Sequence, residues 1–268
     1  MKLRGFFRTG RLKGEIRKAF IEQLYYVNFS RSKISLSLII PIFIILIIID
    51  LHSRDRGLWI TAGYYELFLV HASTAAALTA IYPFFFFSRI DSAAGIRLFH
   101  RVIIKLLCVI IMLSGAVTSS VDQMIHGQIS SFIVISFGIG TVLLIENLFS
   151  ILLYLSALAL FLVGITQTQS VHQQLMGHYI NGVTLTFIAW FMSRVIYSAF
   201  GSNFLYSHKI EDQKNKLIST TTLNDAIFQN IPVGLARILQ DGSIEQTNRH
   251  LLRMLGQTGP VAHLDDIE

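Results

Sequence analysis

Six long runs of apolar residues make up most of the chain, and short polar segments separate them. About 20 apolar residues are enough to cross a bilayer as one helix. The pattern therefore predicts an all-α polytopic membrane protein with six transmembrane helices, the fourth and fifth joined by a tight turn at Glu146 and Asn147. The predicted spans cover roughly residues 34–51, 59–87, 102–121, 127–145, 148–167 and 178–200.

The composition agrees with this pattern and excludes other classes of protein. Hydrophobic residues form 53% of the 268 positions, charged residues only 14%, and the mean hydropathy is +0.57. Soluble domains carry roughly 25% charged residues, so an ordinary soluble enzyme is excluded. The single cysteine, Cys108, rules out a disulfide scaffold. The net charge of +6 comes with no nucleic-acid-binding motif, so we expect no nucleic-acid partner.

The distribution of basic residues predicts the orientation. Nine of the 22 Lys and Arg residues fall in residues 1–33, and the loops after the third and fifth spans contain none. The positive-inside rule then places both termini in the cytoplasm of a multi-pass plasma-membrane protein. In residues 1–33, Leu12, Ile16, Phe20 and Leu24 recur every four positions. This predicts a basic amphipathic helix on the inner membrane surface, with a solvated basic tail as the alternative.

The chain becomes polar after the last span, which defines a transmembrane domain over 34–200 and a connector over 201–222. Ile210 and Leu217 lie one heptad apart in the connector. This spacing predicts that the last membrane helix continues as a short parallel coiled coil in a homodimer, with a plain linker helix as the alternative. Arg194 is predicted to anchor the helix ahead of this connector, and together with Ile210 and Leu217 to transmit a shift of the last membrane helix.

Residues 223–268 change pattern again and predict a small α+β segment. A short helix over 223–230 is followed by a strand, a turn at Asp241–Gly242 and a second strand over 243–247. Asn248 stands where it would cap a following helix. Two strands do not form an independently stable sheet, so this segment is incomplete by itself.

This segment resembles the opening of a PAS domain. The match rests on Asn230-Ile231-Pro232-Val233-Gly234, the Asp241–Gly242 turn, Asn248 and Leu255–Gly256. It covers about 45 residues, roughly half of a PAS domain. The resemblance implies that the native protein continues beyond Glu268.

The membrane part is similar to the MASE-type sensor regions of bacterial signalling proteins. The similarity rests on Asp122-Gln123 with His126-Gly127-Gln128, on Asn181, Ser193-Arg194 and Tyr197, and on Ile210-Glu211-Asp212-Gln213 with Leu217. Such regions precede PAS, GGDEF, EAL or histidine-kinase modules. The resemblance implies a sensor in a bacterial inner membrane whose output is cyclic-di-GMP synthesis or turnover, as in diguanylate cyclases and phosphodiesterases, or a histidine kinase as the alternative.

Ionisable residues inside a predicted span are the strongest candidates for a ligand site. Glu66 and His71 lie within the second span, where charged groups are costly and usually have a partner or face a wet cavity. With Tyr64, Tyr65, Asn181 and Thr184 they predict an outward-opening pocket for a small hydrophobic ligand between the second, third and sixth spans. The alternative is a polar clamp that fixes helix packing. Haem ligation by His71 is less favoured.

A metal site is the second candidate. Asp122 and His126 are four residues apart, and His172 and His178 lie in or beside the fifth loop on the same predicted side. Imidazole and carboxylate suit a transition metal. The alternative is that these histidines are solvated or cap helix ends.

No catalytic signature is present in the sequence. It has no glycine-rich phosphate loop, no GGDEF string, no histidine-kinase motif and no HExxH. A six-helix transporter and a metal-dependent membrane enzyme remain alternatives to a sensor. Glu146 is predicted to pair with Arg97 or Arg101.

Overall fold

The computed structural model describes residues 14–241 and 243–256. The chain divides into two compact units that meet between Asn203 and Phe204, and α6 enters both. The first unit is a helix bundle and the second contains the rest of α6 and a small hairpin.

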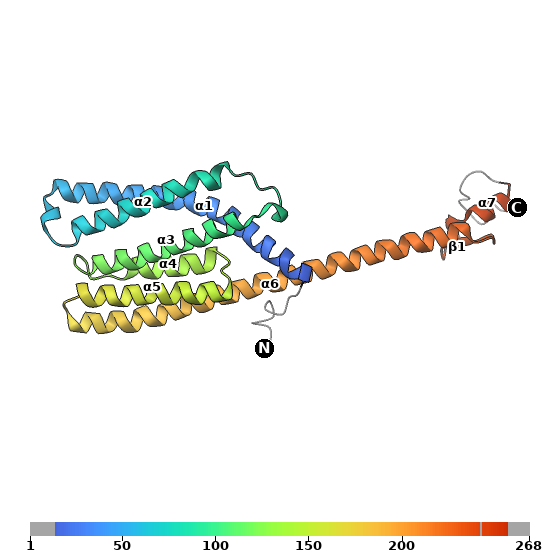
Figure 1. The fold of residues 1–268 in the computed structure, drawn as a ribbon. Coiled ribbons are helices and arrows are strands. Elements are labelled where there is room, and N and C mark those ends of the chain that lie inside the picture. The colour runs from blue at the N-terminus through green and yellow to red at the C-terminus, as the bar shows by residue number, and fades with distance from the viewer. Residues whose placement is uncertain (1–13, 242, 257–268) are drawn as a thin grey trace. The chain divides into compact units, whose positions relative to one another are not determined.

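The bundle is an up-and-down array of helices (Figure 1). We name its two ends by their loops. The distal end holds the α1–α2, α3–α4 and α5–α6 connections, and the proximal end holds the α2–α3 and α4–α5 connections. The helices are α1 (Gly14–Asp55), α2 (Tyr64–Phe87), α3 (Leu98–Asp122), α4 (Ser130–Val142), α5 (Asn147–Thr168) and α6 (His172–Asn230), with the 3-10 turns η3 (Leu58–Ile60) and η4 (Ala93–Gly95) in the loops.

Helix α3 is the centre of the bundle, because it packs against α2, α4 and α5. Half of its most apolar window is buried, compared with 17% for α1. Small residues allow close approach elsewhere: a side chain at Gly140 of α4 would lie 2.5 Å from the Tyr154 hydroxyl and 3.0 Å from the Ala189 carbonyl oxygen. The outward faces remain apolar, with Ile34, Leu38 and Ile48 more than half exposed, as lipid contact requires.

Five helices of the described residues are long and apolar enough to cross a membrane, namely α1, α2, α3, α5 and α6. The chain is therefore a multi-pass membrane protein. The predicted fourth span, 127–145, differs. Its helix α4 has 13 residues, which is about 20 Å and less than the ~30 Å of a bilayer core. The last residues of the predicted span, Leu143–Ile145, are buried but not helical.

For residues 14–33 the prediction of a separate surface helix is wrong. Helix α1 runs without a break from Gly14 to Asp55, through Pro41, so residues 14–33 continue directly into the first predicted span. Phe20 and Leu24 are 2% and 0% exposed. Phe20 packs against Tyr197 and Phe200 of α6 rather than against lipid. Leu12 lies outside the described residues.

The second unit confirms the predicted order of strand, strand and helix. Strands β1 (Ala236–Ile238) and β2 (Ile244–Thr247) pair antiparallel, with Arg237 opposite Gln246, and α7 (Arg249–Met254) follows. Asn248 caps α7 by accepting from Leu251 N at 2.9 Å, and also accepts from Leu235 N at 2.9 Å. The helix predicted over 223–230 is not separate, since it forms the end of α6.

Candidate functional site

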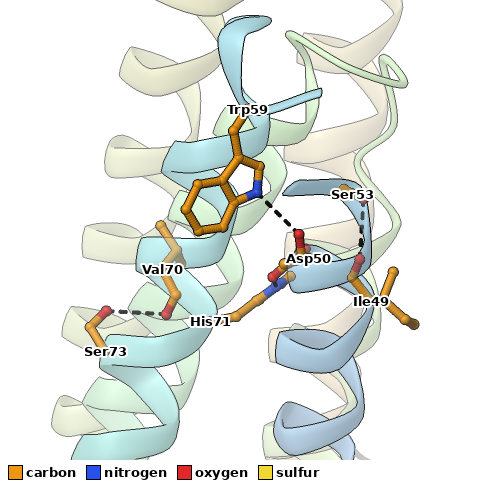
Figure 2. Close-up of polar contacts among 7 residues, drawn as sticks. All are labelled: Ile49, Asp50, Ser53, Trp59, Val70, His71 and Ser73. Atoms are coloured by element: carbon orange, nitrogen blue, oxygen red, sulfur yellow. Dashed lines mark hydrogen bonds and ion pairs between the residues drawn. The ribbon is translucent and has the colours of Figure 1, made fainter. Parts of the chain in front are cut away.

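A buried ionisable pair joins α1 and α2 toward the distal end (Figure 2). The imidazole Nδ1 of His71 lies 2.7 Å from Oδ2 of Asp50, and the two residues are 4% and 6% exposed. Phe43 packs edge-on against the imidazole with 6.0 Å between ring centroids. His71 was predicted from the sequence as a candidate site residue, whereas Asp50 was not. Asp50 is the only ionisable residue in the predicted span 34–51, and that signal was sufficient to find it.

The α1–α2 loop closes over this pair, which we call the distal pair. Gly57 has φ +76°, a left-handed conformation that glycine adopts readily, and the chain turns back there. The indole Nε1 of Trp59 then donates to the backbone carbonyl of Asp50 at 3.0 Å (Figure 2). The indole also packs against Phe68 at 4.8 Å and Tyr65 at 5.1 Å. The loop therefore holds the distal pair away from solvent on this side.

The distal pair can act as a clamp between two helices. A carboxylate and an imidazole in an apolar interior are stable only when paired and hydrogen bonded. Their hydrogen bond replaces the lost solvation and fixes α1 against α2. This contact is the polar clamp that the sequence analysis gave as the alternative for His71.

The predicted ligand pocket does not form from the six residues named for it. Glu66 instead accepts from the backbone N of Gly63 at 2.9 Å and caps α2. Asn181 and Thr184 are exposed on the surface of α6, whereas His71 is buried against α1. Tyr64 is half-buried and Tyr65 is exposed. The prediction grouped these residues by their expected depth, and their side chains face in different directions.

The predicted metal cluster is also not assembled. Asp122 and His126 do meet, with Oδ1 and Nδ1 2.7 Å apart, at an exposed loop position. His172 and His178 lie in the first turns of α6. Within residues 14–241 and 243–256, no three His, Cys, Asp or Glu side chains are close enough to hold a metal ion. These four residues share one end of the bundle, but their side chains do not converge on a common metal position.

A second polar site surrounds the α4–α5 connection at the proximal end. Asn28 of α1 donates from Nδ2 to the carbonyl of Leu144 at 2.8 Å and accepts from Leu144 N at 2.8 Å. Arg31, one turn later, donates to the carbonyl of Val142 at 3.0 Å. Asn28 is 2% exposed, so its amide replaces the helical hydrogen bonds that Leu144 lacks.

Arg194 of α6 contacts the same connection from the other side. Its guanidinium donates to Asn147 Oδ1 at 2.6 Å and to the carbonyl of Ile145 at 2.5 Å, and it lies over the Tyr197 ring at 5.1 Å. Arg194 is 6% exposed. Arg194 was predicted to anchor the end of the last span, and in the structure it makes contacts inside the bundle.

Glu146 completes this site, with partners that differ from those predicted. It accepts from the hydroxyl of Tyr25 and pairs with Lys105 Nζ at 3.1 Å, rather than with Arg97 or Arg101. Arg101 instead lies over the Tyr25 ring at 5.5 Å. Helices α1, α3 and α6 thus converge on the α4–α5 connection. We call this set the proximal clasp: Tyr25, Asn28, Arg31, Lys105 and Arg194, around residues 142–147.

Three residues were predicted to transmit a signal, and two of them, Ile210 and Leu217, lie on α6 beyond Asn203, whereas Arg194 lies within the bundle. Ile210 and Leu217 are 65% and 68% exposed. Tyr206 and Ile227 are exposed by 65% and 50%. These four residues fall on a or d sites of one heptad frame and form a partial stripe along α6, whose other a and d sites hold Gln213, Thr220 and Asn224. Ile218 and Leu223 are also exposed but lie off this stripe.

Comparison with known proteins gives no match to a family model, a curated protein or a solved structure. The class of the protein therefore rests on the chain itself. It is a helical, multi-pass membrane protein with a short antiparallel hairpin toward its C-terminus.

Proposed function

We propose that the chain is the membrane sensor region of a bacterial signal-transduction protein. The observation that carries this proposal is the continuity of α6, which runs as one helix from His172 in the bundle to Asn230, next to the β1–β2 hairpin. A change in the bundle that displaces α6 is passed along an unbroken helix to the hairpin segment. The resemblance to MASE-type regions and to the start of a PAS domain supports the same assignment.

The proximal clasp supports a role for α6 in transmission. Arg194 bonds α6 to the α4–α5 connection, and Asn28 and Glu146 bond that connection to α1 and α3. A shift among these helices therefore changes the contacts that hold α6. A ligand shifts such an equilibrium only by binding two arrangements with different affinity.

The stripe on α6 supports a homodimer as the signalling unit. Its heptad spacing suits a parallel coiled coil with a second copy of the chain. In this proposal six helices cross a bacterial inner membrane, α4 being the short one, and both termini are cytoplasmic. The output is cyclic-di-GMP synthesis or turnover by a following domain, with a histidine kinase as the alternative.

Cysteine cross-linking in native membranes tests both parts of the proposal. Leu217→Cys is expected to form an interchain disulfide, and Ser219→Cys, two residues away on another face of the helix, is the matched control. Cys108 is buried, so the parent chain supplies the background. Equal cross-linking at both positions would reject the coiled coil.

Transmission is tested by combining Leu217→Cys with a change in the clasp. Arg194→Gln is expected to alter the rate of cross-linking at position 217, while Arg89→Gln, at an exposed position, leaves it unchanged. A rate that is the same in all three backgrounds would reject transmission from the clasp and leave the dimer intact.

A further inference from the structure

A pocket of about 240 Å³ lies between the first turns of α1 and the first turn of α3. It is lined by Gly14, Arg17, Lys18 and Ile21 of α1 and by Arg101 of α3. None of these residues belongs to the distal pair or the proximal clasp. The pocket is smaller than the sites of drug-sized molecules, which measure about 300–1,000 Å³. Three of its five lining residues are cationic, so it suits a small anionic group.

The spacing of the lining residues on α1 explains how the two helices form this pocket. Lys18, Ile21 and Tyr25 follow one another at intervals of three and four residues, which places them on one face of the helix. The guanidinium of Arg101 lies over the Tyr25 ring at 5.5 Å, so it reaches the same face from α3. Nε of Arg101 is buried, which leaves Nη1 and Nη2 as the donors for a ligand.

The positive charge of this pocket has no counter-charge in its lining. In the part of the chain that the structure describes, its three cations form no ion pair. Glu15 and Glu22 of α1 are not lining residues. Glu146 of the proximal clasp is already paired with Lys105 Nζ at 3.1 Å. Because like charges repel one another, an anion in the pocket lowers the electrostatic energy.

The position of Arg101 along α3 places the pocket at the level of the lipid head groups. Helix α3 has 25 residues, which is about 38 Å and longer than the ~30 Å of a bilayer core, and Arg101 is in its first turn. Val102 and Leu106 follow on α3 and are 53% and 47% exposed, as lipid contact requires. A molecule with an anionic head and apolar chains meets both surfaces, whereas a free anion meets only the pocket.

We propose that this pocket binds the phosphate of an anionic phospholipid. Nη1 and Nη2 of Arg101 donate to two phosphate oxygens, a geometry that the planar guanidinium favours. Arg17 and Lys18 add positive charge, and basic pockets between membrane helices are typical sites for lipid head groups. The pocket binds such a lipid whether or not the chain transmits a signal, so binding is measured separately from cross-linking on α6.

Binding is measured on the full chain in micelles of an uncharged maltoside. Phosphatidylglycerol with a fluorescent acyl chain is titrated, and its anisotropy is followed. Phosphatidylcholine with the same label is the matched arm, since its choline group cancels the charge of the phosphate. We expect saturable binding of phosphatidylglycerol, about tenfold tighter than that of phosphatidylcholine. Inorganic phosphate, added at the concentration of the labelled lipid, tests a free anion as the source of the phosphate and is expected not to displace the lipid.

Variants tie the binding to the pocket. Arg101→Gln removes the charge and the paired donors, and we expect affinity for phosphatidylglycerol to fall about tenfold or more. Arg101→Lys keeps the charge and is expected to lose less. Arg17→Gln/Lys18→Gln changes two exposed positions that do not affect folding, and we expect a fall of about fivefold for each charge removed. Arg89→Gln makes the same change of charge at an exposed proximal position outside the lining and is expected to bind normally.

Three results would overturn the proposal. The first is an equal loss of binding in Arg89→Gln and in the variants of the lining, which would show a general attraction between basic surface and acidic lipid. The second is equal affinity for the two lipids, or no saturable binding of phosphatidylglycerol. The third is displacement of the labelled lipid by inorganic phosphate, which would assign the pocket to a free anion.

Discussion

The two polar sites of the bundle are built in different ways. The distal pair joins two side chains, Asp50 and His71, on consecutive helices. The proximal clasp adds bonds from side chains to backbone: Asn28, Arg31 and Arg194 donate to carbonyl groups of residues 142–145, which are far away in the sequence. A side-chain pair can be replaced as a unit by apolar residues, whereas backbone groups cannot be removed by substitution. The clasp is therefore the less replaceable of the two.

The clasp also compensates for the short length of α4. Because the helix ends at Val142, Leu144 has backbone groups that no helical hydrogen bond satisfies. Irregular backbone inside a membrane protein is tolerated only where protein or a wet cavity satisfies it. Asn28 and Arg194 meet this need, and in doing so they link α1 and α6 to one connection.

The largest effect is expected from Asn28→Leu. This change leaves both the N–H and the C=O of Leu144 buried without partners, and we expect a loss of about 4 kcal/mol in the free energy of unfolding, about 2 for each group. Unfolding in mixed micelles measures it. Asn181→Leu, the same substitution at an exposed position on α6, is the control. A small loss at position 28 would contradict the role of the clasp.

His71→Leu is expected to have the next largest effect. It leaves the Asp50 carboxylate buried and unpaired, which destabilises by about 3 kcal/mol. The double variant Asp50→Leu/His71→Leu is expected to recover most of that loss, because it removes both partners. The same unfolding assay on both variants decides the point. If the double variant is as unstable as the single one, the distal pair is not a replaceable side-chain clamp.

A smaller effect is expected from Trp59→Phe. The substitution keeps an aromatic ring near Phe68 and removes the hydrogen bond to the Asp50 carbonyl, so the expected loss is about 1 kcal/mol. Hydrogen exchange of α1 amides near Asp50 is expected to increase, while exchange in the clasp at Leu144 stays unchanged. Increased exchange at both ends would show that the two sites are coupled.

The smallest effect is expected at the Asp122–His126 pair. The His126 side chain is 58% exposed, and exposed ion pairs contribute about 0–1 kcal/mol. His126→Ala is expected to change the free energy of unfolding by less than about 0.5 kcal/mol. Added Zn²⁺ is expected to leave the unfolding midpoint of the unchanged chain where it was. A metal-dependent shift that His126→Ala abolishes would restore the metal-site hypothesis for this loop.

The sequence predicted the positions of the helices better than the directions of their side chains. Apolar runs located α2, α3 and α5. The turn residue Asp241 located the hairpin, and the cap residue Asn248 located the start of α7. His71 was selected because an ionisable residue inside a span is costly wherever it faces. Asn181 and Thr184 were grouped with it by depth alone, and the rotation of α6 turns them outward.

By itself the sequence determined that this is a multi-pass helical membrane protein, since the length and apolarity of a span are local properties. It also determined the hairpin segment, because turn and cap residues act over a few positions. Only the tertiary structure decided that α4 ends early and that Asn28 and Arg194 satisfy the backbone groups of the buried segment that follows it. Those contacts join residues 116 and 49 positions apart, and no local pattern encodes which distant side chain satisfies a given backbone group.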